Sequence, residues 1–301
     1  MTERHEAKGA TQIGAPILAR QAHETADTGL GPLIQRVGAF ETRIASTRKD
    51  IGKARRLRFK TFYEEGGAIA SLREALSRRE YCPFDALCDH IVVVDTQAIG
   101  ASGRRKRKVI ATCRLLRGEI ARRHGGFCTQ NEFDLGGLLA RQGDKRIVEI
   151  GRACVAQAYR KTKGVELLWR GVWAYIAHHR IDMMIGCASF PGRDANAHAG
   201  PLSFLHHVAP APATLGVAPV AGRRADFALQ PMEAIEQRRA LAALPPLIKA
   251  YLRLGATFGE GAVVDHQFAT VDVFTLLTVE AMRERFQRFD PARMLEPSAV
   301  Q

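Results

Sequence analysis

Long hydrophobic runs are missing from this 301-residue sequence. The longest candidate, Val208 to Gly222, is interrupted by Pro210, Pro212 and Pro219, and no run reaches the roughly 18 apolar residues of a membrane-spanning helix. The polar N-terminus lacks the compact apolar core of a signal peptide. We therefore expect a cytoplasmic protein whose membrane contact is at most peripheral, at the inner face of the cytoplasmic membrane.

Metal-binding and disulfide patterns are missing as well. None of the six cysteines stands in a Cys-x-x-Cys pair, which favours free thiols in a reducing compartment. The adjacent histidines His178-His179 and His206-His207 would point about 100° apart on a helix, with no Cys or carboxylate at ligand spacing. The sequence predicts neither a metal site nor a redox cofactor.

Nucleotide-binding motifs are also absent. There is no Walker loop and no Gly-x-Gly-x-x-Gly, so nucleotide-hydrolase and Rossmann hypotheses lose support. The basic stretches have no zinc-finger spacing, recognition-helix signature or aromatic RNA-binding pattern beside them. Nucleic acid is therefore not the expected partner.

What the sequence has in excess is positive charge. Lys and Arg outnumber Asp and Glu by 44 to 31, which gives a formal charge of +13. Such an excess favours an anionic partner, whether nucleic acid, anionic lipid or an acidic carrier protein. The densest run spans residues 104–108 and contains Arg104, Arg105 and Lys106; it is either a docking site or an ordinary solvated hairpin tip.

The hydrophobic pattern predicts an α/β or α+β protein with a mixed sheet. The β-branched run 91–94 and the segment 109–117 read as a hairpin, and strands follow at 146–155 and 182–189 around a helix at 165–180. Further elements are expected as helices at 54–63, 68–79, 133–140, 196–207 and as a helical pair at 232–253, before a closing β segment at 262–277. We expect residues 1–31 to be a disordered tail and residues 32–295 to form a single domain.

A charged pair stands inside one predicted strand, in the run Glu149-Ile150-Gly151-Arg152-Ala153-Cys154-Val155. Buried charges are costly unless they are paired or used. Residues three apart on a regular strand face opposite sides, so both can face a cleft only if the strand bulges, which Gly151 would permit. The pair is either a carboxylate and a guanidinium beside a reacting amine or a structural ion pair.

Other charged residues suggest an anion site and a zwitterion site. Arg160, Lys161, Lys163 and Gly164 stand at the start of the 165–180 helix, where backbone N–H groups could hold a phosphate; an ordinary basic loop is the alternative. Arginines for a substrate carboxylate and aspartates for its ammonium groups are available as Arg58, Arg114, Asp85 and Asp89. Each also has a structural alternative: Arg58 would fit a solvated helix face, Arg114 a buried strand, and the two aspartates loop caps.

Several linked motifs carry a family resemblance. They are the segments 84–95, 111–116, 149–155, 186–194 and 244–256. In this order they resemble the bacterial ornithine lipid synthases, which are L-ornithine Nα-acyltransferases of the hemolysin-like acyltransferase group. The resemblance covers about residues 40 to 290 and implies a GNAT-like fold with a mostly antiparallel sheet. It extends, more distantly, to acyl-homoserine-lactone synthases.

The resemblance implies transfer of a 3-hydroxyacyl chain from acyl carrier protein to the α-amine of L-ornithine. The product would be lyso-ornithine lipid, the first intermediate of ornithine lipid biosynthesis, and the donor phosphopantetheine would replace any separate cofactor. Glu149 and Arg152 would be catalytic. The substrate-binding positions would be Arg58, Asp85, Asp89, Arg114, Ser189 and Asp194. Carrier contacts would come from Arg104, Arg105, Lys106, Arg160, Lys161, Lys163 and Gly164.

One departure from the GNAT pattern bears on the donor. The pyrophosphate loop of these enzymes ends in a small residue, whereas Lys161-x-x-Gly164-x-Glu166 places an acid there. This disfavours coenzyme A and suits a carrier protein. The alternatives are an acyl-homoserine-lactone-synthase-like enzyme, an acceptor such as glutamine, lysine or glycine, and a non-enzymatic basic binding protein.

Overall fold

A computed structural model describes residues 31–100, 102–161 and 163–286, so the expected tail 1–31 lies almost entirely outside the described residues. The main sheet has nine strands in this part of the chain, in the order β1-β2-β3-β4-β6-β7-β11-β10, with β9 also paired to β11. Their bounds are β1 Leu33–Val37, β2 Phe40–Ile44, β3 Asp89–Asp95, β4 Lys108–Arg117, β6 Ile147–Val155, β7 Met183–Pro191, β9 Thr257–Phe258, β10 Val263–Asp265 and β11 Thr270–Thr278. A separate pair joins β5 Phe133–Asp134 to β8 Ala218–Pro219.

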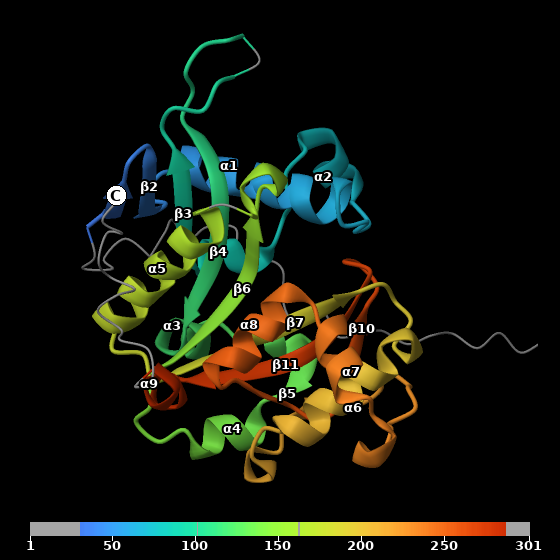
Figure 1. Cartoon of the computed structure of the whole chain (residues 1–301). Helices are drawn as coiled ribbons and strands as arrows, with labels where there is room; N and C mark the ends of the chain where they lie inside the picture. The colour runs from blue at the N-terminus through green and yellow to red at the C-terminus, as the bar shows by residue number, and fades with distance from the viewer. Residues whose placement is uncertain (1–30, 101, 162, 287–301) are drawn as a thin grey trace, which may run out of the picture.

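Helices cover both faces of this sheet (Figure 1). The α-helices are α1 Arg48–Phe59, α2 Leu72–Ser77, α3 Gly118–Arg123, α4 Gly136–Arg141, α5 Lys163–His178, α6 Ala199–Val208, α7 Gln237–Ala243, α8 Pro246–Leu254 and α9 Val279–Phe286. A π-helical turn, η2 Lys60–Glu64, extends α1. The 3-10 turns are η3 Pro83–Ala86, η4 Cys128–Asn131, η5 Gln157–Tyr159, η6 Asn196–His198, η7 Ala213–Leu215 and η8 Met232–Ala234. No helix in these ranges is both long and apolar enough to cross a bilayer.

The two faces of the sheet follow from side-chain alternation. In β3, Ile91 and Val93 pack toward α5, while Val92 and Val94 pack toward Ala54 and Leu57 of α1. A central strand that is covered on both sides reads as a continuous apolar run, and all seven residues of β3 are buried. We call the side that carries α1 the α1 face; the other side carries α5, α6 and α8.

One strand pair is parallel among antiparallel neighbours. β6 and β7 pair only from Ile147–Glu149 to Met183–Ile185, and α5 connects them as the crossover. Beyond this short ladder no further pairing joins them in the described chain. The sheet therefore opens between the second half of β6 and the second half of β7.

Most sequence-based elements are confirmed, including the 91–94 and 109–117 hairpin, the two later strands and their connecting helix. The mixed, mostly antiparallel sheet is confirmed as well. The helix expected at 133–140 was wrong at its start, because Phe133 and Asp134 pair with β8 and only the residues from Gly136 are helical. The helix expected at 68–79 is shorter, since Ser71 and Glu74 form a capping box that fixes its start at Leu72.

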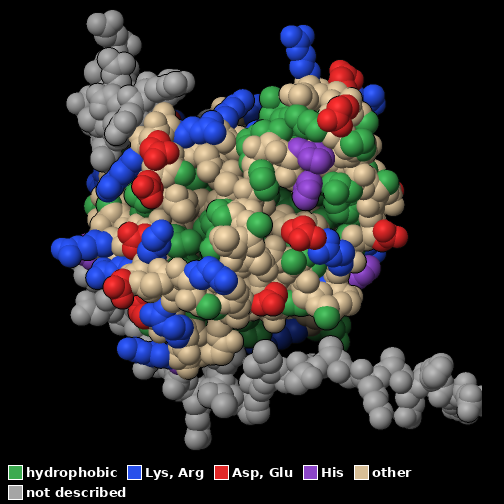
Figure 2. All heavy atoms as spheres, turned by 90° about the horizontal axis from the view of Figure 1, so that it is seen from below, with side chains coloured by type: hydrophobic (Ala, Val, Ile, Leu, Met, Phe, Trp, Pro, Cys, Tyr) green, Lys and Arg blue, Asp and Glu red, His purple; other side chains and the backbone are tan. Residues whose placement is uncertain are grey.

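The excess positive charge is not gathered on the face seen from below. There, Lys and Arg side chains alternate with Asp and Glu, and histidines lie against hydrophobic side chains (Figure 2). The exposed basic run 104–108 instead projects from the opposite end of the molecule, in the loop between β3 and β4 (Figure 1). Lys108 Nζ lies 5.6 Å from the ring centre of Tyr159, so this loop and the segment that leads into α5 share one end of the molecule.

Two helix glycines give a matched test of the packing between α5 and the sheet. A Cβ at Gly171 would lie 2.5 Å from Thr42 Cγ2 and 2.9 Å from Ile91 Cγ2, whereas a Cβ at Gly52 meets nothing closer than 4.0 Å. We expect Gly171→Ala to lower the free energy of unfolding by about 1–3 kcal/mol through overpacking. Gly52→Ala should raise it by about 0.5–1 kcal/mol through helix propensity. Urea denaturation measures both, and a stabilising Gly171→Ala would contradict the close contact.

Candidate active site

Strand β6 bulges at the residues that the sequence singled out. Opposite β4, Cys154 pairs with Thr112 and Gly151 with Arg114, so Arg152 and Ala153 together face one residue of β4. The left-handed backbone belongs to Arg152, with φ at 53°, and not to Gly151. A non-glycine residue in this region stores strain. The expected bulge is thus present, but the arginine itself makes the turn.

Arginines from three elements meet on the α1 face beside this bulge. Arg58 Nε lies 2.7 Å from Glu80 Oε2 and its Nη2 lies 2.5 Å from Asp85 Oδ2. Arg114 Nη1 lies 3.4 Å from Asp85 Oδ1, and Arg152 Nε lies 3.1 Å from Glu80 Oε1. We call these five residues the arginine cluster. Its two acids are almost completely buried, so they hold the arginines and are not free for a substrate.

The ionisation of Asp85 reflects this environment. Burial alone would raise the pKa of Asp85, but the Arg58 and Arg114 guanidiniums hold it well below its usual range. Arg114 also donates to the Cys82 thiol at 2.7 Å. A hydrogen bond from the Cys128 thiol, together with the Arg114 charge, lowers the pKa of Cys82.

Solvent access divides the three arginines. The side chains of Arg58 and Arg114 are 1% and 3% exposed, and that of Arg152 is 25% exposed. The Arg152 guanidinium lies 4.2 Å from the ring centre of Phe268, which stands in the turn between β10 and β11. Arg152 is therefore the member of the cluster that a substrate can reach. Arg58 and Arg114 are buried and hold the two acids in place, and one of these acids, Glu80, orients Arg152.

Glu149 is buried on the same face, but it has hydrogen-bond partners of its own. Its Oε1 accepts from the Thr129 N–H at 2.6 Å and from the Thr129 hydroxyl at 2.5 Å, and its Oε2 accepts from the Cys128 N–H at 3.0 Å. These bonds fix the start of η4 to β6. A carboxylate offers about four lone-pair sites, so a position on Oε2 is left for a further donor.

Asp89 lies apart from the other predicted substrate residues. It begins β3 with its side chain on the opposite face, where Oδ2 accepts from the Tyr175 hydroxyl at 2.5 Å and lies 3.6 Å from Arg117 Nε. Burial raises the pKa of Asp89. Because Asp85 precedes the strand in a 3-10 turn, spacing along the chain could not show that the two aspartates separate.

The remaining predicted positions divide between the site and the surface. Ser189 is exposed on β7 and is paired in register with Asp272 of β11, on the α1 face. Asp194 is an exposed turn residue that accepts the Asn196 N–H at 2.9 Å, and it forms no ion pair with the described residues of the arginine cluster.

The predicted anion site is altered by ion pairs. Arg160 donates to the Val155 carbonyl at 3.0 Å and lies 2.5 Å from Glu65 Oε2, and Glu166 is paired with Arg170 at 2.6 Å. Lys163, the first residue of α5, and Lys161, which precedes the helix, are exposed. Gly164 is required there, because a Cβ would lie 2.9 Å from the Tyr159 carbonyl oxygen.

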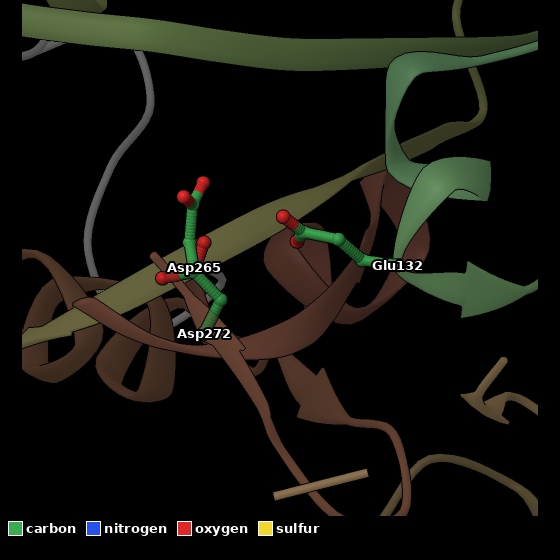
Figure 3. A group of neighbouring side chains, drawn as sticks. All are labelled: Glu132, Asp265 and Asp272. Carbon is green, nitrogen blue, oxygen red and sulfur yellow. The ribbon is translucent and has the colours of Figure 1, made fainter. Parts of the chain in front are cut away.

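Three carboxylates that the sequence analysis did not select lie next to the bulge. Glu132, Asp265 and Asp272 each place a carboxylate oxygen within 4.8 Å of the other two, and the side chains point toward one another (Figure 3). We call them the acidic cluster. Burial, reinforced by Glu132, raises the pKa of Asp272 to about 7, and burial also raises the pKa of Glu132.

The missed residues differ in how visible they were in the sequence. Asp272 is a charge inside an apolar strand, the same signal that singled out Glu149, so the criterion could have found it. Glu132 and Asp265 stand at the ends of short elements, where acids are common as caps. Glu80 lies in a polar connector between α2 and η3, and only the fold shows that it is fully buried.

Comparison with known proteins gives the class and the family. A domain model described as "Acetyltransferase (GNAT) domain" matches residues 57–170. The L-ornithine N(alpha)-acyltransferase of Agrobacterium fabrum is 44% identical over 263 residues, which cover 87% of this chain and 88% of the relative. The enzyme of the same name from Brucella abortus is 42% identical over 87% of this chain and 92% of its own.

Among solved structures, FeeM, an N-acyl amino acid synthase from uncultured soil microbes, aligns with a TM-score of 0.47 and 11% identity. The alignment covers 83% of this chain and 98% of FeeM. The domain match and the sheet with its bulged strand define the class, an acyltransferase with a GNAT-like fold. The chain belongs to the L-ornithine Nα-acyltransferase family.

The arginine cluster predicts a stability loss when an acid is removed. Asp85→Asn leaves Arg58 and Arg114 buried with less compensation, so we expect the free energy of unfolding at pH 7 to fall by about 3–5 kcal/mol. Because the pKa of Asp85 is lower in the folded chain, its stabilisation is present above the unfolded pKa and is lost as pH falls through the folded value. The gap to wild type should therefore shrink below about pH 4. Exposed Asp144→Asn is the control and should change stability by less than about 0.5 kcal/mol; equal losses in the two variants would contradict the argument.

The acidic cluster predicts the opposite effect. The folded pKa of Asp272 is raised to about 7, so the folded chain loses stability as pH rises from the unfolded pKa of about 3.9 to that value. We expect Asp272→Asn to be more stable than wild type by about 1–3 kcal/mol at pH 8, with the difference disappearing toward pH 4. Thermal or urea unfolding across this pH range measures it. A variant less stable than wild type at pH 8 would contradict the strained cluster.

Proposed function

We propose that this protein transfers an acyl chain from a thioester to the α-amine of L-ornithine. The observation that carries the proposal is the bulge in β6: it presents a reachable arginine on the same face of the sheet as the buried carboxylate of Glu149, in a chain of the L-ornithine Nα-acyltransferase family. The amine nitrogen attacks the thioester carbonyl carbon, the C–N bond forms and the C–S bond breaks. One proton leaves the nitrogen and one reaches the departing thiolate.

Arg152 is the proposed partner of the ornithine carboxylate. Its guanidinium is fixed by Glu80 on one side and by the Phe268 ring on the other, so N–H donors on its open side are pre-oriented for a carboxylate. The expectation that Arg58 and Arg114 would bind the substrate directly is replaced by a supporting role, because their side chains are buried and paired with Glu80 and Asp85.

Glu149 is the proposed proton acceptor, through Oε2 or through a water bound there. The hydrogen bonds from Thr129 hold its carboxylate in one orientation, and the Oε2 position that remains can accept a proton from the attacking amine. The tetrahedral oxyanion would be bound by N–H groups of the bulged segment, where β6 has lost its pairing with β7.

The opening between β6 and β7 is the proposed entrance for the thioester. Only a small void of about 10 Å³ lies there, lined mainly by apolar residues, among them Ile150, Met184, Tyr251 and Leu277, so the two strands would have to separate further to admit an acyl chain. It lies against α8, on the face opposite to the arginine cluster. A donor that enters from the α5 and α8 side would meet an acceptor bound on the α1 face at the gap between the strands.

The proposed donor is a 3-hydroxyacyl chain on the phosphopantetheine of acyl carrier protein, and the product is lyso-ornithine lipid. The exposed residues Arg104, Arg105 and Lys106 share one end of the molecule with exposed Lys161 and Lys163, and this gives an acidic carrier a basic surface. Glu166 at the helix start supports a donor without a diphosphate. A peripheral contact with anionic membrane would use the same charges.

In vitro acylation tests the proposal. Purified protein, a 3-hydroxyacyl carrier-protein thioester and L-ornithine should give Nα-(3-hydroxyacyl)ornithine by mass spectrometry, and the same product should appear in lipids of an expressing host that lacks aminolipids. We expect Glu149→Gln to lower kcat by 100-fold or more, while exposed Glu233→Gln keeps wild-type turnover. Wild-type protein that acylates another amine but never ornithine would refute the proposed function. Near-normal turnover of a folded Glu149→Gln variant would refute only the assignment of the base.

A further inference from the structure

We propose that the acidic cluster of Glu132, Asp265 and Asp272 binds the side-chain ammonium group of the acceptor amino acid and so selects a diamino acid. The inference rests on the proposed function, because it assigns a second part of the same acceptor site. The aspartates expected in this role do not serve it: Asp85 is paired with buried arginines, and Asp89 lies on the other face with Tyr175.

The acidic cluster has the features expected of a cation-binding site. Three carboxylates within 4.8 Å of one another repel when they are ionised, and Asp272 is only 6% exposed, so its pKa is raised in the absence of a cation. The Ser189 and Thr270 side chains lie beside its carboxylate and act to lower its pKa, but its buried Oδ1 atom has no hydrogen-bond partner in the described part of the chain. A buried acceptor without a partner is costly, and a positively charged donor would satisfy it.

The number of donors favours an ammonium group over a metal ion. An alkylammonium has three N–H donors, one for each carboxylate of the cluster. Asp265 Oδ1 already accepts the N–H groups of Gln267 and Phe268 at 2.8 and 2.9 Å, which leaves its other oxygen for a ligand. Mg²⁺ or Ca²⁺ would need further oxygen ligands from water or backbone to complete a shell of six or more, whereas the three carboxylates alone satisfy the three donors of an alkylammonium.

The acidic cluster lies beside the proposed carboxylate site. Asp265 fixes the turn whose Phe268 ring lies under the Arg152 guanidinium, and the charge of Arg152 reaches Glu132. The Cys187 side chain, next to Glu132, lies 3.8 Å from the Thr129 hydroxyl that donates to Glu149. The arginine, the proposed base and the acidic cluster thus lie near one another on one face of the sheet.

The surface between these groups is not covered by a helix. Gly151 and Arg152 of β6 and Cys187 of β7 are half-buried, and Ser189 is exposed, although all belong to interior strands of the sheet. A zwitterion on this strip would place its carboxylate at Arg152 and its side-chain ammonium at the acidic cluster. Its α-amine would then face the opening between β6 and β7.

The test compares L-ornithine with L-norvaline, which has the same carbon skeleton without the side-chain amine. We expect wild type to prefer ornithine by at least 100-fold in kcat/KM. Asp272→Asn and Glu132→Gln should each reduce this preference at least tenfold, mainly by raising KM for ornithine. The exposed acids give matched controls, Asp226→Asn and Glu233→Gln, which should keep the wild-type preference.

A binding measurement without donor separates this inference from catalysis. Ornithine should raise the melting temperature of wild type more than norvaline does, and Asp272→Asn should lose that difference while still melting cooperatively. An unchanged ornithine preference in both folded variants would overturn the inference and leave the proposed function standing. Turnover that requires added Mg²⁺ or Mn²⁺, with metal binding lost in Asp272→Asn, would also overturn it, because the cluster would then be a metal site.

Discussion

The left-handed turn at Arg152 is the constraint on which the rest of the site depends. It shifts the register between β6 and β4 and directs the guanidinium between Glu80 and Phe268. Glycine would adopt this backbone without strain, and a glycine is next to it in the sequence, yet the arginine makes the turn. A glycine at position 152 would avoid this backbone strain, so the presence of arginine there points to a function for its side chain. The bulge lies close to the point where the pairing between β6 and β7 ends. The Arg152 guanidinium, an unpaired strand edge and the opening in the sheet are therefore found together.

Buried charge on the α1 face follows two different rules. In the arginine cluster, every guanidinium is met by an acid, so the charges hold α1, β4, β6 and the 80–85 segment in fixed relation. Removing one partner leaves the others uncompensated. In the acidic cluster the charges are alike and no basic side chain of the described chain forms an ion pair with them. The first arrangement stabilises the fold by itself. In the second, burial and repulsion raise the pKa of Asp272 to about 7, and the repulsion is relieved by a proton or, in the proposed site, by the ammonium group of the substrate.

The sequence predicted those features that depend on neighbouring residues alone. The run Ile91-Val92-Val93-Val94 and the alternation in 109–117 predicted two strands because burial on both faces requires continuous apolar residues, and the bulge followed from two charges three apart in a strand. The β1–β2 hairpin was missed, since Arg36, Glu41 and Arg43 interrupt its apolar residues and Gly38 alone marks the turn. The separation of Asp85 from Asp89 depends on where a 3-10 turn ends and β3 begins, and the role of Glu80 depends on α1 folding back over β4. Contacts between distant segments decide such cases, and no spacing along the chain encodes them.

The positive and the negative clusters of the α1 face belong to different halves of the sheet, and these halves are joined by a short ladder. β6 belongs to the half that carries the arginine cluster, and β7 belongs to the half that carries Asp272 through β11. Only three residue pairs hold these halves together in register. The turn between β10 and β11, however, reaches back to η2, where Phe268 packs on Tyr63, and to the loop after η2, where the Ile69 N–H donates to the Gln267 carbonyl at 2.7 Å. That turn spans the opening on the α1 face. Its carboxylate Asp265 and its ring Phe268 therefore fix the spacing between the positive and the negative end of the acceptor strip, and a substrate held at both ends would be aligned with the gap that lies between them.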